Sequence, residues 1–416
     1  MLTTGECQPI SRRSSEAFAV PCELGHKAPS RSLTEEIQRW TLLWPDPPSG
    51  NMTSHRSSAD MLDTNFLATQ EPVRMIPYQH VISFNERIRQ TVPSGLVALF
   101  VGATSGIGQA VLQILGARLP NASVYVVGRS EAMFASDINR LRVLNPEAKI
   151  VFLEAQVSLL REVDRVCEQI LTSEEKLDLL YMSPGYLGFG GPHYTEEGLD
   201  LCFFLSVYAR ARFVQRLQPL MAAAKQPRVL SILAGGRERA LWTVNDDLDL
   251  RQDGGRHYTV LRAVAQVTTL HTLNLAYLAS QNPHIAFIHV YPGLVDTGMH
   301  FVLLKSLGRG GGILAHAVDA VRKRFMAIPV ERSGQWQAFH ALTSRFPSRE
   351  MIIAGRYDAN DCAQCHVLHS GLYLVGAKGD SCANAGVLQS EVVRDWQRRS
   401  WQFVEDTIQQ ALQKRN

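Results

Sequence analysis

Short apolar runs alternate with stretches of helical periodicity from about residue 95 onward. Six runs have the length and β-branched content of buried strands: Leu96–Val101, Ser123–Val127, Ile150–Leu153, Leu177–Tyr181, Val229–Leu233 and Ala286–Val290. Patterns typical of amphipathic helices lie between them, for example over Ala110–Ala117. Alternating strands and helices predict parallel βαβ units, because right-handed crossovers favour that topology. The chain is therefore expected to form an α/β fold with a doubly wound parallel sheet in a single main domain.

The two ends of the chain lack this alternation. Residues 1–74 are rich in Ser, Pro and Arg without sustained periodicity, which predicts a disordered extension or a mis-called start of the chain. Residues 75–345 are expected to form the main domain and residues 346–416 a C-terminal extension. Within that extension, Arg345–Ser390 is interpreted as surface decoration. Glu391–Leu412 carries apolar residues at helical spacing and predicts a docked helix.

Composition and charge exclude several classes of protein. The 416 residues include 42 Lys+Arg and 39 Asp+Glu, a formal net charge of +3, which is too balanced for a nucleic-acid-binding surface. No apolar run approaches the roughly 20 residues that span a bilayer. The N terminus lacks the apolar core of a signal peptide, and the seven cysteines are scattered and odd in number. We expect a cytoplasmic protein with no nucleic-acid partner and no integral membrane segment.

A glycine-rich turn, Gly102–Gly108, separates the first predicted strand from the first predicted helix. Glycines in this context allow a tight turn and a close approach to a pyrophosphate, and the amino terminus of the helix supplies free N–H groups. The turn predicts a Rossmann-like nucleotide site; a purely structural turn is the alternative. The candidate cofactor residues in it are Gly102, Thr104, Ser105, Gly106, Ile107 and Gly108.

The end of the second strand indicates which nucleotide is bound. Gly128-Arg129-Ser130 occupies the place where an acidic residue would accept from the ribose 2′-hydroxyl of NAD. A guanidinium can instead form paired hydrogen bonds with a 2′-phosphate, so Arg129 favours NADP. The alternative interpretation of Arg129 is a solvated turn arginine.

Three motifs in this order resemble the short-chain dehydrogenase/reductase family: the glycine turn, Tyr258-xxx-Arg262, and Tyr291–Thr297 after the sixth strand. The similarity covers about residues 90–345, and Asp246–Arg251 is similar to a fungal branch often found in secondary metabolism. The resemblance implies further NADP contacts from Gln156, Tyr258, Arg262, Pro292, Gly293, Val295 and Thr297.

The family resemblance also implies the catalytic groups, with a degenerate tetrad. Tyr258 matches the tyrosine that exchanges a proton with the substrate while hydride moves to or from the nicotinamide. Arg262, four residues later, stands in place of the lysine that lowers the tyrosine pKa; it keeps the charge but not the shape. The serine position aligns most simply with Ala234, and Ser231 lies three residues earlier. We therefore predict Tyr258, Arg262 and Ser231 as the catalytic residues. The helix of the family asparagine offers either Ser206 or Tyr208.

Three functions are compatible with this pattern. The first is NADP-dependent reduction of a carbonyl, or oxidation of an alcohol, on a hydrophobic small molecule. The second is a redox-neutral isomerisation or dehydration, and the third is nucleotide binding by a non-catalytic sensor or scaffold. Apolar Met299–Leu304, followed by the hinge Gly308–Gly312, predicts a lid over substrate, with Phe189, Tyr194 and Trp242 as aromatic walls. Ordinary core packing is the alternative for each of these residues.

Two further features leave alternatives open. The helix after Tyr258 has an apolar side that either pairs in a homodimer, as in family members, or packs within the chain. Cys362-Ala363-Gln364-Cys365-His366 matches the pattern of c-type haem attachment and, with His369, is a conceivable zinc-ligand set. We expect an unliganded loop there and no metal site.

Overall fold

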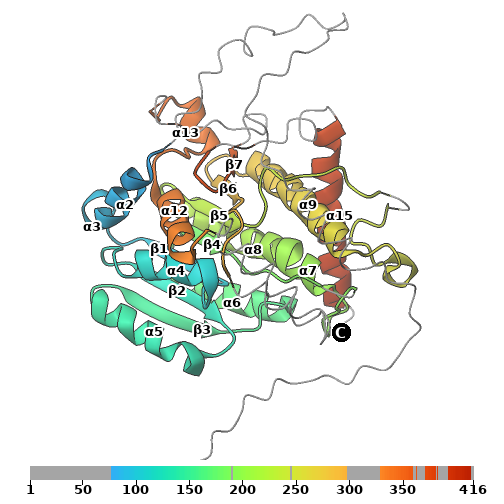
Figure 1. Ribbon diagram of the computed structural model, residues 1–416, viewed down its shortest axis with the longest axis horizontal. Helices are drawn as coiled ribbons and strands as arrows, with labels where there is room; N and C mark the ends of the chain where they lie inside the picture. Colours follow the sequence, from blue (N-terminus) through green and yellow to red (C-terminus); the bar gives the residue numbers. More distant parts are fainter. Residues whose placement is uncertain are drawn as a thin grey trace, which may run out of the picture. The chain divides into compact units, whose positions relative to one another are not determined.

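The computed structural model describes residues 76–188, 191–243, 246–297, 328–358, 362, 371–380, 382 and 392–413. In these ranges seven parallel strands form one sheet in the order β3-β2-β1-β4-β5-β6-β7 (Figure 1). The strands are β1 (Val97–Val101), β2 (Ser123–Gly128), β3 (Lys149–Glu154), β4 (Leu179–Met182), β5 (Arg228–Ile232), β6 (Ala286–Val290) and β7 (Leu372–Val375). The doubly wound parallel sheet and its six predicted strands are confirmed. The predicted N-terminal extension lies outside the described residues.

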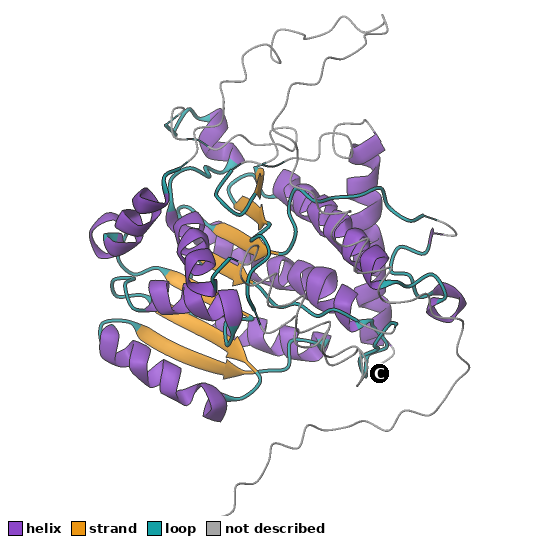
Figure 2. Ribbon diagram, in the orientation of Figure 1, coloured by secondary structure: helices purple, strands orange, loops and turns teal. Residues whose placement is uncertain are grey.

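Helices cover both faces of the sheet (Figure 2). One face carries α4 (Gly106–Gly116), α5 (Glu131–Leu144) and α12 (Val330–Leu342), and the other carries α6 (Leu160–Ser173), α8 (Ala209–Ala223) and α9 (Val260–Gln281). Because both faces are covered, all residues of β1, β4 and β5 are buried, which explains their continuous apolar runs. None of the helices in the described ranges is long and apolar enough to cross a membrane.

Shorter elements connect these layers. They are α2 (Tyr78–Glu86), α3 (Ile88–Thr91), α7 (Leu201–Phe203), a π-helical turn (Phe204–Tyr208), a 3₁₀ turn (Gln252–Gly255) and α13 (Arg349–Ile353). The π-helical turn continues directly into α8, so the backbone from Leu201 to Ala223 is helical with one locally widened turn.

The C-terminal extension contributes a strand to the sheet. β7 pairs in parallel with β6, from Phe287 opposite Leu372 to Val290 opposite Val375, and its four residues are buried. The interpretation of Arg345–Ser390 as surface decoration is therefore wrong for this stretch. A short apolar run is ambiguous by itself, and here pairing with the open edge of β6 makes it a strand.

The C-terminal helix α15 (Val392–Gln413) packs along α9, as the periodicity predicts (Figure 1). Trp401, Val404 and Ile408 of α15 are buried, and the Trp401 ring stacks on Tyr277 of α9 with centroids 5.4 Å apart. Gln215 of α8 also donates a hydrogen bond to the carboxylate of Glu405 (3.2 Å). A helix of the same chain therefore covers apolar surface of α9. The sequence had left two explanations for an apolar side of this helix, packing within the chain and pairing in a homodimer, and α15 provides the first of them.

Trp401→Ala should lower the free energy of unfolding by about 3–5 kcal/mol, because it removes a buried ring from between α15 and α9. Trp396→Ala, which removes a half-buried ring from the same helix, is the matched control and should cost less. Urea denaturation followed by circular dichroism measures both. Equal losses would contradict docking of α15 through Trp401.

Candidate functional site

The carboxyl ends of β1 and β4 meet at the point where the strand order changes direction. β1 pairs with β2 on one side and with β4 on the other, so successive crossovers run to opposite sides of the sheet. Open parallel sheets bind ligands in the crevice outside such a switch point. The glycine turn follows β1 and the loop Ser183–Gly185 follows β4, so both border this crevice.

The glycine turn has a shape that only glycine allows. Gly102 has φ +81°, and a Cβ there would lie 2.5 Å from the backbone nitrogen of Pro184. A Cβ on Gly108 would lie 2.5 Å from the carbonyl oxygen of Gly102. Ser105 caps α4 by position, yet its side chain accepts no hydrogen bond from the first turn. The Ser105 side chain thus does not occupy the positive end of the α4 dipole, where an anion such as a nucleotide pyrophosphate could bind.

The loop after β6 returns to this turn. A Cβ on Gly106 would lie 3.3 Å from the methyl carbon of Thr297, which places Thr297 beside the first turn of α4. The backbone N–H of Thr297 donates to the carbonyl of Val295 (2.8 Å), and Val295 forms a parallel bridge with Ile328. The segment from Pro292 to Thr297 thus reaches the glycine turn. The predicted lid, Met299–Leu304 with Gly308–Gly312, lies outside the described residues, as do Phe189, Cys365 and His366.

A cavity of about 280 Å³ lies at the carboxyl ends of β2 and β3 and is lined by Arg129, Glu154, Ala155, Gln156, Leu159, Arg161 and Glu162. Arg129 is exposed and forms no ion pair within the described ranges. Arg161, in contrast, donates to the Glu196 carboxylate (2.7 Å). The Gln156 amide donates to Ser158 Oγ (3.0 Å). The cavity therefore offers one guanidinium that is free to bind a ligand.

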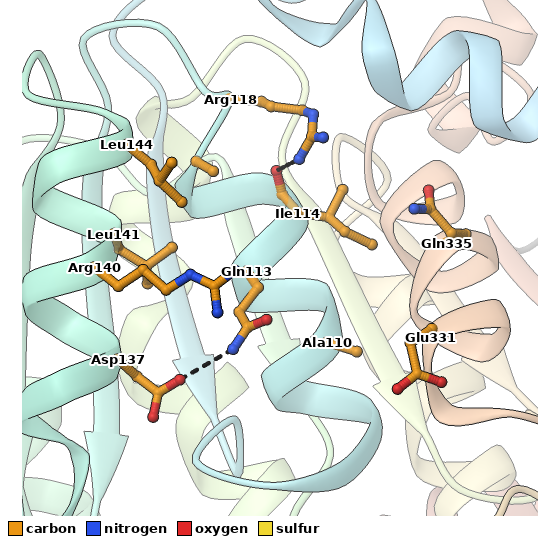
Figure 3. Close-up of a pocket in the computed structure, with 11 residues that line it drawn as sticks. Ala110, Gln113, Ile114, Arg118, Asp137, Arg140, Leu141, Leu144, Glu331 and Gln335 are labelled. Carbon is orange, nitrogen blue, oxygen red and sulfur yellow. Dashed lines mark hydrogen bonds between the residues drawn. The ribbon is translucent and has the colours of Figure 1, made fainter.

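A second cavity, of about 490 Å³, lies between α4, α5 and α12 (Figure 3). Its lining includes Gln113, whose amide donates to Asp137 (3.0 Å), together with Arg140 and Glu331 (Figure 3). It shares no residue with the glycine turn or with the cavity beside Arg129, so it is separate from the crevice.

Tyr258 precedes α9 instead of lying within it. Thr259 is the N-cap, with extended backbone (φ −132°, ψ 151°), and its hydroxyl accepts from the N–H of Arg262 (3.2 Å). Tyr258 and Arg262 are therefore not on successive turns of one helix. The Arg262 guanidinium donates to the carbonyl of His257 and lies over the Trp242 ring, 4.1 Å from its centroid. The predicted pairing of Tyr258 with Arg262 is not formed.

Tyr258 lies in a buried, acidic environment. The residue is 8% exposed, and its hydroxyl makes no hydrogen bond of standard geometry to any described residue. The backbone at Gly188 covers it, since a Cβ there would lie 2.7 Å from the hydroxyl oxygen. Burial raises the pKa of Tyr258 far above its usual value, and Cys202 and Asp200 raise it further. Tyr258 is therefore a protonated phenol at neutral pH, and the raised pKa makes it a weaker acid than a free tyrosine.

Ser231 lies inside β5 and does not reach the crevice. It is 0% exposed, and its hydroxyl contacts both Arg210 Nη1 and His271 Nε2, the latter at 2.7 Å. The two candidates for the asparagine position are also turned inward: Ser206 is buried, and the Tyr208 hydroxyl donates to Asp249 (3.1 Å). The expectation that Ser231 contacts substrate is thus not met in this conformation.

The sequence interpretation missed Arg210, a buried residue of α8. Its Nε donates to the carbonyl of Leu205 (3.0 Å) and its Nη2 to that of Pro184 (2.6 Å) in the loop after β4. Burial lowers the pKa of Arg210 to about 9, so it remains a cation at neutral pH. The available signal was a charge on an apolar helix face, because Val214 and Leu217 follow at helical spacing.

Further buried polar side chains lie next to Ser231, on α9 and β6. The rings of His271 and His289 meet edge to face with centroids 4.8 Å apart, and His289 Nδ1 lies 2.9 Å from Thr272 Oγ1. Thr272 in turn donates to Glu238 (2.7 Å). Burial lowers the pKa of His271 well below its usual value, and the neighbouring His289 and Arg210 lower it further. Burial likewise lowers the pKa of His289 to about 3, so both rings are neutral.

Comparisons with known proteins match a family model and full-length relatives to this chain. Residues 96–241 match the family model described as short chain dehydrogenase. The chain is 34% identical over 321 residues to oxidoreductase AN1596 of Emericella nidulans, covering 76% of this chain and 94% of that protein. It is 35% identical over 343 residues to oxidoreductase lepF of Aspergillus flavus, covering 76% and 92%. Among solved structures, L-sorbose reductase from Gluconobacter frateurii complexed with NADPH and L-sorbose is similar with a TM-score of 0.46 and 19% identity, covering 60% of this chain and 90% of that one.

The neutral buried histidines should make the protein acid-sensitive. Below the unfolded-state histidine pKa of about 6.5, the unfolded chain binds protons that folded His271 does not, so stability falls by about 1.4 kcal/mol per pH unit for this group. His271→Gln should flatten the decline in the free energy of unfolding between about pH 6.5 and 5 by that amount. Urea denaturation across this range tests it, with exposed His80→Gln as the control. Parallel pH profiles for wild type and His271→Gln would contradict the prediction.

Proposed function

The chain belongs to the short-chain dehydrogenase/reductase family, whose members are enzymes, and on that premise we propose that it is an NADP-dependent oxidoreductase that reduces a carbonyl on a hydrophobic small molecule. The observation that carries the proposal is the open, glycine-only turn at the start of α4, with Thr297 beside it. The fungal origin of the oxidoreductases that it resembles supports a role in secondary-metabolite biosynthesis.

The residues around the crevice suit each part of the cofactor. The backbone from Gly102 to Gly108 would hold the pyrophosphate, because its N–H groups lie at the open end of α4. The free guanidinium of Arg129 would bind the 2′-phosphate, and the Gln156 amide would face the adenine. The segment Pro292–Thr297 would contact the nicotinamide end. When bound, the nicotinamide supplies the hydride.

Tyr258 would donate the proton that the substrate oxygen needs during reduction. Its burial beside Asp200 and Cys202 keeps the phenol protonated, which is the form that donates during reduction, although the raised pKa weakens it as an acid. The backbone at Gly188 must withdraw before a substrate oxygen can reach the hydroxyl. Trp242 and exposed Tyr194 supply aromatic surface that supports a hydrophobic substrate.

Two observations favour a second candidate, a nucleotide-binding sensor or scaffold without turnover. Gly188 covers the Tyr258 hydroxyl, and Arg262 is held on Trp242 instead of beside Tyr258. Both candidates require NADP binding, and only the oxidoreductase consumes NADPH. A redox-neutral isomerase or dehydratase would convert its substrate without net NADPH consumption.

Cofactor preference is tested by fluorescence titration with NADPH and NADH. Arg129→Glu should weaken NADPH binding by at least about tenfold, because it removes a hydrogen-bonded cation from the 2′-phosphate, and should change NADH affinity by less than about twofold. Arg140→Glu, the same charge change at an exposed position on α5, is the control. Failure of the wild-type protein to bind either nucleotide would overturn both the oxidoreductase and the sensor.

Proton donation is tested by Tyr258→Phe, which should lower kcat for apolar ketones by about 10²- to 10⁴-fold with little change in NADPH affinity. Tyr357→Phe removes a hydroxyl from an exposed tyrosine outside the candidate site and should leave kcat unchanged. NADPH consumption measures both. An active Tyr258→Phe variant would show that another group delivers the proton.

A further inference from the structure

A buried guanidinium lies beneath the crevice without a carboxylate partner. Arg210 is 1% exposed and forms no ion pair with the described residues. Removing such a charge from water costs several kcal/mol, and an apolar side chain of similar volume would avoid that cost. Packing alone therefore does not account for an arginine at this position.

The hydrogen bonds of Arg210 join three elements of the fold. Nη2 donates to the carbonyl of Pro184 (2.6 Å), and Nη1 is within 3.4 Å of the carbonyl of Met182 at the end of β4. Nη1 also donates to Ser231 in β5, and Nε donates to Leu205 in the π-helical turn (3.0 Å). The planar guanidinium directs these donors at fixed angles, which an ammonium group cannot reproduce.

Pro184, the residue that Arg210 holds, forms one wall of the glycine turn. Its backbone nitrogen would lie 2.5 Å from a Cβ on Gly102, so the two segments are in close contact. The preceding residue reinforces this contact, because Ser183 Oγ donates to the carbonyl of Gly102 and Ser183 N to that of Val101, both at 2.9 Å. Any displacement of Pro184 must therefore either press on Gly102 or open the turn.

We propose that Arg210 is a positioning residue for the NADP site: it holds the loop after β4 against the glycine turn and so shapes the backbone that receives the cofactor pyrophosphate. This inference rests on the proposed function. The same guanidinium contacts Ser231, whose hydroxyl contacts His271, and the His271 ring packs edge to face on His289. His289 and Thr272 lead on to Glu238, whose carboxylate accepts from Gly236 N (2.9 Å) just beyond β5. Arg210 thereby links the carboxyl ends of β4 and β5 from inside the fold.

Arg228 provides a matched control. It is also a buried arginine, and its guanidinium donates to the backbone carbonyls of Ala341 and Thr343. Arg228 is the first residue of β5, so it lies at the amino end of the strand, away from the crevice at the carboxyl ends. If Arg210 has a purely structural role, Arg210→Lys and Arg228→Lys should both lower Tm. Both variants should then leave NADPH binding by the folded protein unchanged.

The experiment uses the full chain and two readouts below Tm. The first is amide hydrogen exchange without cofactor, in peptides covering residues 100–108 and 181–188. The second is the NADPH Kd. Arg210→Lys should raise exchange in both peptides and weaken NADPH binding by about tenfold or more, the scale of a lost hydrogen bond to a charged group, whereas Arg228→Lys should do neither.

Each other result overturns a defined claim. Unchanged exchange in Arg210→Lys, or exchange raised equally in both variants, overturns the positioning role even if wild type binds NADPH. Raised exchange in Arg210→Lys with unchanged NADPH affinity also overturns it, because the loop would then not govern the site. Wild type that fails to bind NADPH overturns the proposed function, and with it the role of Arg210 toward that cofactor.

Discussion

The close approach of Pro184 to Gly102 is the contact on which the rest of the site depends. With a Cβ excluded at Gly102, the loop after β4 can lie directly against the turn after β1, at the point where the sheet reverses its winding. Beside that contact, Ser105 leaves the first turn of α4 without a side-chain cap, and Thr297 lies next to Gly106. Backbone segments, the glycine turn and the loop after β4, thus border the crevice. Buried side chains such as Arg210 contribute by donating hydrogen bonds to these segments.

Polar groups behind the sheet provide this support. Two buried hydrogen-bonded groups lie there, Arg210–Ser231–His271 and His289–Thr272–Glu238, and the rings of His271 and His289 meet edge to face between them. Buried polar groups must be satisfied, so these two groups admit few alternative arrangements. The cost is sensitivity to protonation, since neutral His271 and His289 are held in a place where a charged ring would be unsolvated.

The same region explains why the residues that the sequence predicts as catalytic depart from the family pattern. Thr259 caps α9, which places Tyr258 outside the helix and separates it from Arg262. Arg262 instead stacks on Trp242, an aromatic contact suited to a guanidinium. Tyr258 then lies beside Asp200 and Cys202, where burial and neighbouring acids keep the phenol protonated. The environment of the tyrosine therefore holds the proton on the phenol, because no described cation beside it lowers the pKa.

Local patterns in the sequence determined six of the seven strands, the glycine turn after β1 and the docked helix α15, because each depends on periodicity or on the conformational range of a few adjacent residues. Tertiary structure alone decided the rest. Leu372–Val375 becomes a strand through the edge of β6, and Ser231 is withdrawn from the crevice by Arg210 and His271, which come from other elements. Even the start of α9, one residue after Thr259, separated two residues that helical spacing would have paired. For β7 and Ser231, hydrogen bonds and burial in the assembled fold outweighed the local pattern, and their partners lie too far apart in the chain for spacing to reveal them. At α9 the competing contact is the local cap by Thr259.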